Sequence, residues 1–287
     1  MGNKTTILAL LLLTALLTVR AASPVPLTRP DLSAVTGIAP KYFGPNAFPV
    51  PDMLDGRIPD QPKADIAVDY FKGFLVEGAT DITQDFFLGV HIPLFSKRAS
   101  LSVWMPVVER WHYDAAIRTA RRIGSADGDI GYDSGDAYFG VNIQVLEESA
   151  RRPGVTLRAI SKSASGNNYC YARYYDAPGY YFDASAGKSW GAFRLAVSSG
   201  FLAWQTDNGR QNDATMYGVQ LAYTLRQLLL QASWGGYIGW EDHGDRPSTL
   251  KARAAWRFGH IEPYLFFQQG LHDYPFRQYR LGAVYYH

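Results

Sequence analysis

The chain has 287 residues, of which 47% are hydrophobic and 14% aromatic, while only 19% are charged, a balance that excludes a wholly disordered protein. Its 28 basic and 26 acidic residues give a net charge of +2, which lacks the strong basic excess of a typical nucleic-acid-binding protein. The 19 tyrosines and 7 tryptophans favour a setting where one end of each ring is apolar and the other wet, such as a membrane interface.

The N-terminus predicts a secretory signal peptide over residues 1–21. Lys4 precedes the apolar run from Ile7 to Leu17, and cleavage is expected near Ala21 or Ala22. The run is too short to span a bilayer as a helix, and no later segment has the roughly 18 apolar residues that such a helix needs. The exported chain then holds one cysteine, Cys170, which we interpret as an incidental free thiol because it cannot form an internal disulfide.

Residues 22–64 form a proline-rich segment that we interpret as a periplasmic lead-in. Nine prolines exclude a regular helix or a central strand there. An extended segment and plain disorder both fit this composition, although Phe43 and Phe48 indicate that part of it packs against something.

From residue 65 to 287 the apolar residues recur with period two, which is the pattern of strands with two differently solvated faces. Tyr217 to Arg226 and Leu250 to Phe258 alternate almost without exception. The predicted strands are 65–77, 83–95, 99–113, 136–148, 154–165, 178–189, 192–206, 213–226, 228–240, 249–259, 261–270 and 277–287.

Twelve strands with short turns on one side and mostly longer loops on the other predict an all-β fold, a closed antiparallel transmembrane β-barrel. A soluble β-sandwich also alternates, but its outer face should be rich in Lys and Glu. Here the non-apolar face is mainly Gly, Ala, Ser, Asn and Gln, which suits a crowded lumen. Aromatic residues near strand ends are predicted to form interface girdles: Trp111, Tyr113, Tyr138, Trp204, Tyr217, Trp240 and Tyr285.

The last predicted strand resembles the C-terminal insertion strand of Gram-negative outer-membrane barrels, with His287 where those proteins usually end in Phe. A looser resemblance, to outer-membrane barrels of the phenol-degradation (MetA) pathway, covers about residues 130–287. It rests on Gly135-Asp136, Arg152-Pro153-Gly154, Ser163 to Gly166, Asn208-Gly209-Arg210 and Leu281-Gly282. This resemblance supports the barrel architecture more than any substrate.

Two loops resemble parts of enzymatic barrels. Asn208-Gly209-Arg210 matches the tail of the outer-membrane phospholipase motif, but Gln205 and Asp207 replace its His and Ser, so no activated hydroxyl can form. Asp242-His243 could serve as the acid–His pair of an omptin-like protease, which also needs a second acidic pair that the sequence does not reveal. An outer-membrane hydrolase is therefore the third hypothesis for function, and we expect no enzyme activity.

No metal or other cofactor is predicted. The six histidines lack the paired spacing of a zinc site. Asp127, Asp129, Asp133 and Asp136 lie in a glycine-rich loop and could offer oxygens to calcium, but the closing Glu of a calcium loop is missing. We prefer to interpret these four aspartates as ordinary turn residues.

Charged residues on the non-apolar strand faces predict a basic-leaning lumen. They are Arg158, Asp183, Arg194, Lys251, Arg253, Arg257, Glu262 and Arg280. If water fills the lumen, the barrel is a narrow channel or translocation barrel for small molecules, and its basic lumen favours anions. If the charges pair across the interior, it is a non-conducting structural or partner-docking barrel. Either barrel would lie in the outer membrane with periplasmic termini, contact lipid and lipopolysaccharide, and require the outer-membrane assembly machinery; we expect no nucleic-acid partner.

Overall fold

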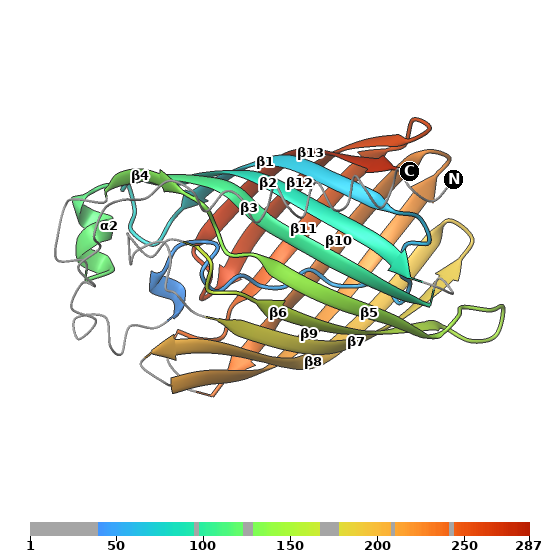
Figure 1. Ribbon diagram of the computed structural model, residues 1–287. Helices are drawn as coiled ribbons and strands as arrows, with labels where there is room; N and C mark the ends of the chain where they lie inside the picture. Colours follow the sequence, from blue (N-terminus) through green and yellow to red (C-terminus); the bar gives the residue numbers. More distant parts are fainter. Residues whose placement is uncertain (1–39, 95–97, 123–128, 167–177, 208–209, 241–243) are drawn as a thin grey trace. The chain divides into compact units, whose positions relative to one another are not determined.

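The computed structural model describes residues 40–94, 98–122, 129–166, 178–207, 210–240 and 244–287 (Figure 1). The predicted signal peptide, Cys170, Asp127 and the Asp242-His243 pair lie outside these residues. No helix in the described ranges is long and apolar enough to cross a membrane.

The described chain is all-β apart from two short helical turns, and its strands form one antiparallel sheet that closes on itself. β1 pairs with β2 on one side and with β13 on the other, so the first and last strands form the seam. The strands are β1 (Lys63–Gly73), β2 (Asp81–Leu94), β3 (Ala99–Tyr113), β4 (Ile130–Asp133), β5 (Tyr138–Leu146), β6 (Gly154–Lys162), β7 (Gly179–Trp190), β8 (Phe193–Asp207), β9 (Arg210–Leu225), β10 (Leu228–Gly239), β11 (Ser248–Trp256), β12 (Ile261–His272) and β13 (Phe276–Tyr286).

Twelve of these strands form the closed barrel, which confirms the predicted fold class and strand number. The additional strand is β4, which pairs only with the far part of β3, beyond the stretch of β3 that pairs with β5. The sequence predicted a plain connection over 114–135. Instead, α2 (Ala115–Ala120) precedes β4, and Asp114 caps this helix by accepting hydrogen bonds from two backbone N–H groups.

The connections divide the barrel into two ends. At the short-turn end lie the turns 191–192, 226–227 and 257–260, together with the C-terminal residue. At the long-loop end lie the connections 74–80, 240–247 and the one that contains α2. Figure 1 shows α2 and β4 at this second end.

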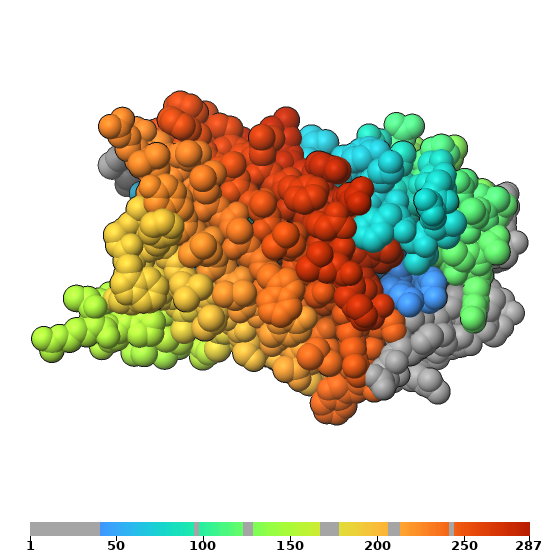
Figure 2. All heavy atoms as spheres, turned by 180° about the vertical axis from the view of Figure 1, so that it is seen from behind, coloured from blue at the N-terminus to red at the C-terminus, as the bar shows by residue number. Residues whose placement is uncertain are grey.

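The outer face of the barrel is apolar over much of its height. On β8, for example, Phe193, Leu195 and Val197 are exposed, while Arg194 and Ala196 between them are buried. The same alternation places exposed residues such as Phe139, Phe182, Leu221, Leu230, Leu250, Leu265 and Leu281 on the outer face of other strands. Figure 2 shows the continuous surface that β10 to β13 form. Because a soluble monomer rarely exposes so large an apolar surface, this face fits contact with lipid.

Candidate functional site

The barrel interior is occupied by residues 40–62, which we call the inner segment. Prolines 45, 49, 51, 59 and 62 fix its backbone angles and keep it out of a helix after η2 (Pro40–Tyr42). Its first residues meet the long-loop end, where the Lys41 N–H donates to the carbonyl of Gly244. Its last residue meets the short-turn end, where the His287 N–H donates to the carbonyl of Pro62. The inner segment therefore crosses the lumen and then turns back into β1 (Figure 1). We expected these residues in a periplasmic lead-in; the structure places residues 40–62 inside the barrel.

At the long-loop end, the inner segment offers a polar donor to an acidic part of the wall. The Asn46 side-chain amide donates one hydrogen bond to the Asp85 carboxylate and one to the Glu109 carboxylate. The nitrogen–oxygen distance is 2.7 Å in both. These two carboxylates lie opposite each other on β2 and β3 and are buried. Phe48 is buried nearby, with its ring centroid 6.5 Å from that of Trp204.

From the long-loop end, where Lys162 is the last residue of β6, to the short-turn end, cationic wall residues hold the backbone of the inner segment. The bonds are Lys162 to the carbonyl of Ala47 (3.1 Å), Lys251 to Val50 (2.8 Å), Arg158 to Asp52 (2.7 Å) and Arg194 to Asp55 (3.0 Å). Neutral side chains add bonds of the same kind, from Tyr274 to Pro45, Tyr237 to Phe48 and Gln144 to Gly56. The wall thus binds an extended backbone by its carbonyl oxygens, from one end of the lumen to the other.

Two acidic side chains of the inner segment form ion pairs with this basic part of the wall. Asp52 lies 2.5 Å from the Lys251 ammonium, and Asp55 lies 3.2 Å from the Arg194 guanidinium. Both cations are buried. The inner segment is therefore complementary in charge to the wall along its length, with an amide donor beside acids and carboxylates beside cations.

Arg194 also ties the inner segment to a turn at the short-turn end. It lies 2.5 Å from Glu148, whose carboxylate also accepts a hydrogen bond from the Ser189 N–H. Burial by itself would raise the pKa of Glu148, but the hydrogen bonds from Arg194 and Ser189 outweigh it and hold the pKa below its ordinary value. Glu148 therefore stays ionised and keeps Arg194 aimed at the inner segment.

The other charges that we predicted for the lumen form pairs within the wall. Arg158 binds Asp183 on the neighbouring strand at 2.7 Å, Arg253 binds Glu262 at 2.8 Å, and Arg280 binds Asp69 at 2.6 Å. Arg257 instead donates to the carbonyl of Gly259 and to Gln61 of the inner segment. The excess of positive charge that we predicted for the lumen is thus largely balanced by carboxylates of the wall and of the inner segment.

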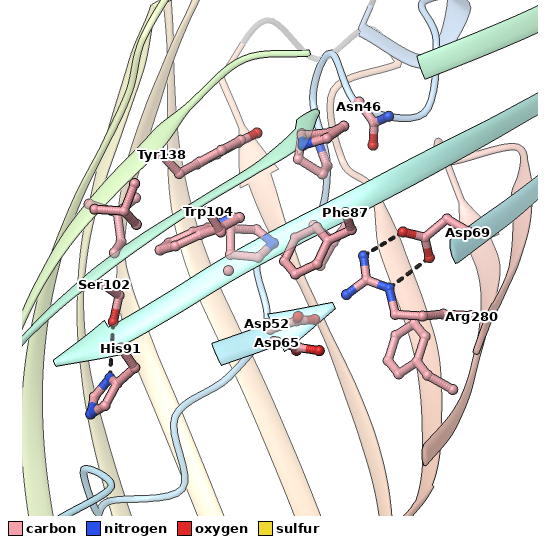
Figure 3. A pocket seen from close by; sticks show the side chains of 18 of the residues that line it. Asn46, Asp52, Asp65, Asp69, Phe87, His91, Ser102, Trp104, Tyr138 and Arg280 are labelled. Carbon is pink, nitrogen blue, oxygen red and sulfur yellow. Dashed lines mark hydrogen bonds and ion pairs between the residues drawn. The ribbon is translucent and has the colours of Figure 1, made fainter. Parts of the chain in front are cut away.

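A cavity of about 350 Å³ remains beside the inner segment. Inner-segment residues line one side, and the wall lines the other, with β1, β2 and β3 supplying about half of the wall residues. In Figure 3, Trp104, Phe87 and Arg280 face this space, with Arg280 bonded to Asp69. The Trp104 ring stacks on Tyr138 at 5.1 Å, and the Arg280 guanidinium lies 4.2 Å from the centre of the Phe87 ring.

The narrowest contact between the inner segment and the wall is made by three glycines. A Cβ atom on Gly187 would lie 1.9 Å from the carbonyl oxygen of Asp55, and one on Gly154 would lie 2.6 Å from that of Gly56. Gly56 itself has a φ of +81°, a backbone conformation that glycine adopts without strain. The absence of side chains at these positions allows the two backbones to touch.

Four of the seven predicted interface aromatics are not at the lipid interface. Trp111, Tyr113, Tyr138 and Trp204 are buried and point inward, so this prediction is wrong for them. Tyr138 and Trp204 occupy inward positions of the regular alternation. Trp111 and Tyr113 follow a β-bulge in β3, where the register with β2 shifts and reverses which residues face inward.

The remaining three aromatics lie on the outer side. Trp240 is 72% exposed and Tyr285 48% exposed, and the half-buried ring of Tyr217 packs on the exposed Trp234 at 5.1 Å. Trp240 directly follows β10 and Tyr285 lies near the end of β13, whereas Tyr217 lies in the middle of β9, so a girdle stays a prediction for Trp240 and Tyr285.

The acidic loop residues have separate partners. Asp129 pairs with Arg118, Asp133 accepts from the Ser134 N–H, and Asp136 pairs with Lys162. Among the described residues, no group of three or more His, Cys, Asp or Glu side chains could hold a metal ion.

Sequence reasoning missed the contribution of the inner segment to this site. Asn46, Asp52 and Asp55 were not singled out, because a carboxylate between prolines looks like ordinary loop polarity. The usable signal was the pair of aromatic residues Phe43 and Phe48, since large apolar side chains in a proline-rich stretch indicate a buried partner.

No protein-family model matches the chain, and no curated protein sequence is significantly similar to it. Solved structures with a similar fold include KdgM porin, at 10% identity and a TM-score of 0.45, and NanC porin, at 11% and 0.48; each match covers 77% of this chain and 98% of the porin. Outer membrane phospholipase A from Escherichia coli matches at 12% identity and a TM-score of 0.43, over 78% of this chain and 90% of that one. These solved structures include both porins and a hydrolase.

Proposed function

We propose that the protein is a narrow outer-membrane channel for small molecules and that the inner segment closes it at rest. The observation that carries this proposal is the way the inner segment is held. Every hydrogen bond from residues 45–59 to the described wall strands involves a side chain on at least one partner. The inner segment can therefore leave the lumen without unpairing any strand of the barrel.

The location follows from the two faces of the wall. The outer face is apolar, and the interior carries charged and amide side chains, which is the arrangement of a barrel in an outer membrane. In such barrels the long loops face the outside of the cell and the short turns face the periplasm. The C-terminus would then be periplasmic, and lipid and lipopolysaccharide would cover the outer face.

Three further expectations belong to this proposal. Export would use the signal peptide over residues 1–21. Insertion would use the outer-membrane assembly machinery, and the alternation of exposed and buried residues along β13 supports recognition of this strand by that machinery. The predicted domain division assigns residues 65–287 to the barrel. Membership of the phenol-degradation (MetA) barrel family is supported by the short turn motifs alone.

A non-conducting structural or partner-docking barrel is the second candidate. The observation that favours it is the pairing of wall charges, such as Arg158 with Asp183 and Arg280 with Asp69, because paired buried charges also suit a permanently filled interior.

Conductance of the intact protein in planar bilayers tests the proposal. We expect the wild type to be mostly closed and the variant Asn46→Ala/Asp52→Asn/Asp55→Asn to be mostly open. This variant loses the side-chain bonds of the inner segment to the acidic residues of the wall and to its cations. The matched control removes two exposed charges instead, in the variant Glu77→Gln/Glu147→Gln, and should behave like the wild type. Folding is checked by heat-modifiable migration on gels. If the folded triple variant is silent, the channel is refuted and the docking barrel replaces it.

A further inference from the structure

Lys251 is the wall cation that depends most on the inner segment. It lies on β11 and is 8% exposed. Its ammonium donates to the carbonyl of Val50 and to the carboxylate of Asp52, and both partners belong to the inner segment. Within the described chain, no wall residue forms a hydrogen bond or ion pair with it.

Arg194 lies nearer the short-turn end and depends on the inner segment in part. It donates to the carbonyl of Asp55 and pairs with the Asp55 carboxylate, and it also pairs with Glu148 and donates to the Ser189 hydroxyl, both outside the inner segment. Arg158 differs, since its charge is already matched by Asp183 and it gives the inner segment only a bond to the carbonyl of Asp52. Two wall cations therefore use carboxylates of the inner segment as counter-ions.

This dependence restricts how the channel can open. When the inner segment leaves, Lys251 loses its counter-ion, and an unpaired cation in a partly desolvated interior is strongly unfavourable. An incoming neutral solute would leave that charge uncompensated, and an incoming cation would be repelled. An anion would take over the interaction that Asp52 supplies in the closed state.

We infer that the solute of the channel is a small molecule with two carboxylates, which bind Lys251 and Arg194 in place of the side chains of Asp52 and Asp55. This inference rests on the proposed channel function and names its substrate class. The two aspartates are three residues apart in an extended segment, so their Cα atoms lie at most about 10 Å apart. A flexible aliphatic dicarboxylate can reach both cations within this span.

Binding of adipate to the intact protein tests the inference. Titration calorimetry would compare adipate with adipamide, its uncharged diamide. The variant Asp52→Asn/Asp55→Asn keeps the shape of the inner segment but removes the carboxylate that pairs with Lys251 and the inner-segment carboxylate that pairs with Arg194, which keeps its pair with Glu148. We expect adipate to bind this variant about tenfold more tightly than the wild type, since a competing charged hydrogen bond is removed. Adipamide should bind neither protein.

Two further substitutions in the Asp52→Asn/Asp55→Asn background identify the site. Lys251→Gln should abolish the gain in adipate affinity. Lys72→Gln removes the same charge from an exposed position on β1 and should leave the gain intact. All variants are first checked for heat-modifiable migration, and a Lys251→Met variant replaces Lys251→Gln if the latter does not fold.

The outcomes separate the inference from the channel proposal. Equal affinity for adipate and adipamide, or tight adipate binding that survives Lys251→Gln, overturns the dicarboxylate site even if the barrel conducts. Adipate binding that requires Lys251 supports the site even if bilayers stay silent, and in that case the channel proposal alone fails.

Discussion

Gly187 is the position where one added methyl group should release the inner segment. In Gly187→Ala, the new Cβ would lie 1.9 Å from the Asp55 carbonyl oxygen and 2.5 Å from an Arg194 guanidinium nitrogen. The separation from the oxygen has to grow to about 3.4 Å before the contact is ordinary. The inner segment is the side that moves, because Gly187 is fixed in β7 by pairing with both β6 and β8.

That movement removes the bonds between Arg194 and the Asp55 carbonyl oxygen. A hydrogen bond to a charged group contributes about 1.5–3 kcal/mol, so losing two weakens the closed state by about 3 kcal/mol or more. Such a change raises the ratio of open to closed channels about 100-fold. Alanine is compatible with a strand, so the barrel itself should keep its stability.

Single-channel recording gives the open probability that this reasoning predicts. Gly89→Ala is the matched control, because its Cβ would face the same lumen but would meet side-chain atoms of Phe87 and Trp104 at 3.3 Å or more. An unchanged open probability in Gly187→Ala, with a folded barrel, would refute the role of the inner segment as the closed gate. An equal increase in Gly89→Ala would show that any added bulk in the lumen has this effect.

Three further predictions concern the sidedness, stability and pH response of the barrel. A Lys41→Cys variant with Cys170 replaced by Ser should react with an impermeant maleimide added to intact cells, because residue 41 contacts the long-loop end. Arg280→Met should lower the free energy of unfolding by about 3–5 kcal/mol in urea titrations, because it leaves the buried Asp69 carboxylate without its cation. Hydrogen bonds from backbone N–H groups, that of Thr80 first, lower the pKa of Asp114 below 3.8, so its cap should stabilise α2 above pH 3.8 and lose this effect as the pH falls through the lowered pKa. Hydrogen exchange of α2 amides would record that loss.

Each of these predictions has an internal control. Gln61→Cys, near the short-turn end, should stay unlabelled in intact cells, and labelling of both thiols would contradict the assigned course of the inner segment. Arg277→Met removes an exposed arginine of the same strand and should change stability by less than about 1 kcal/mol. Asp114→Asn should make the protection factors of the α2 amides, which correct for the intrinsic pH dependence of exchange, independent of pH in this range; protection that is still lost in acid would assign the effect to another group.

The fold could be predicted from sequence because strand alternation is a local signal. Phe193, Leu195 and Val197 identify the lipid face of β8 without reference to any other strand. Twelve such patterns are enough to predict the number of strands in the barrel. The bulge in β3 could not be predicted because one extra residue hardly changes the composition of the strand. It nevertheless reverses which residues point inward, so Trp111 and Tyr113 face the interior.

The site was less predictable because its partners are far apart in sequence. Alternation placed Arg158, Arg194 and Lys251 on the inner face, but nothing local indicates that the counter-ion of Lys251 is Asp52, about 200 positions earlier in the chain. A proline-rich stretch has no periodicity to analyse, so the course of the inner segment emerges only from three-dimensional contacts.

The seam between β1 and β13 has a consequence for how the barrel assembles. β13 is synthesised after the other strands of the barrel, so the ring can close only when all of these strands are present. The inner segment immediately precedes β1 and lies on its inner side. If it binds Lys251, Arg194 and Lys162 on the open sheet, ring closure encloses it, and the chain need not be threaded through a finished pore. The inner segment would then act as a template that the nascent sheet wraps around, and its carbonyl contacts would favour the curvature that brings β13 to β1.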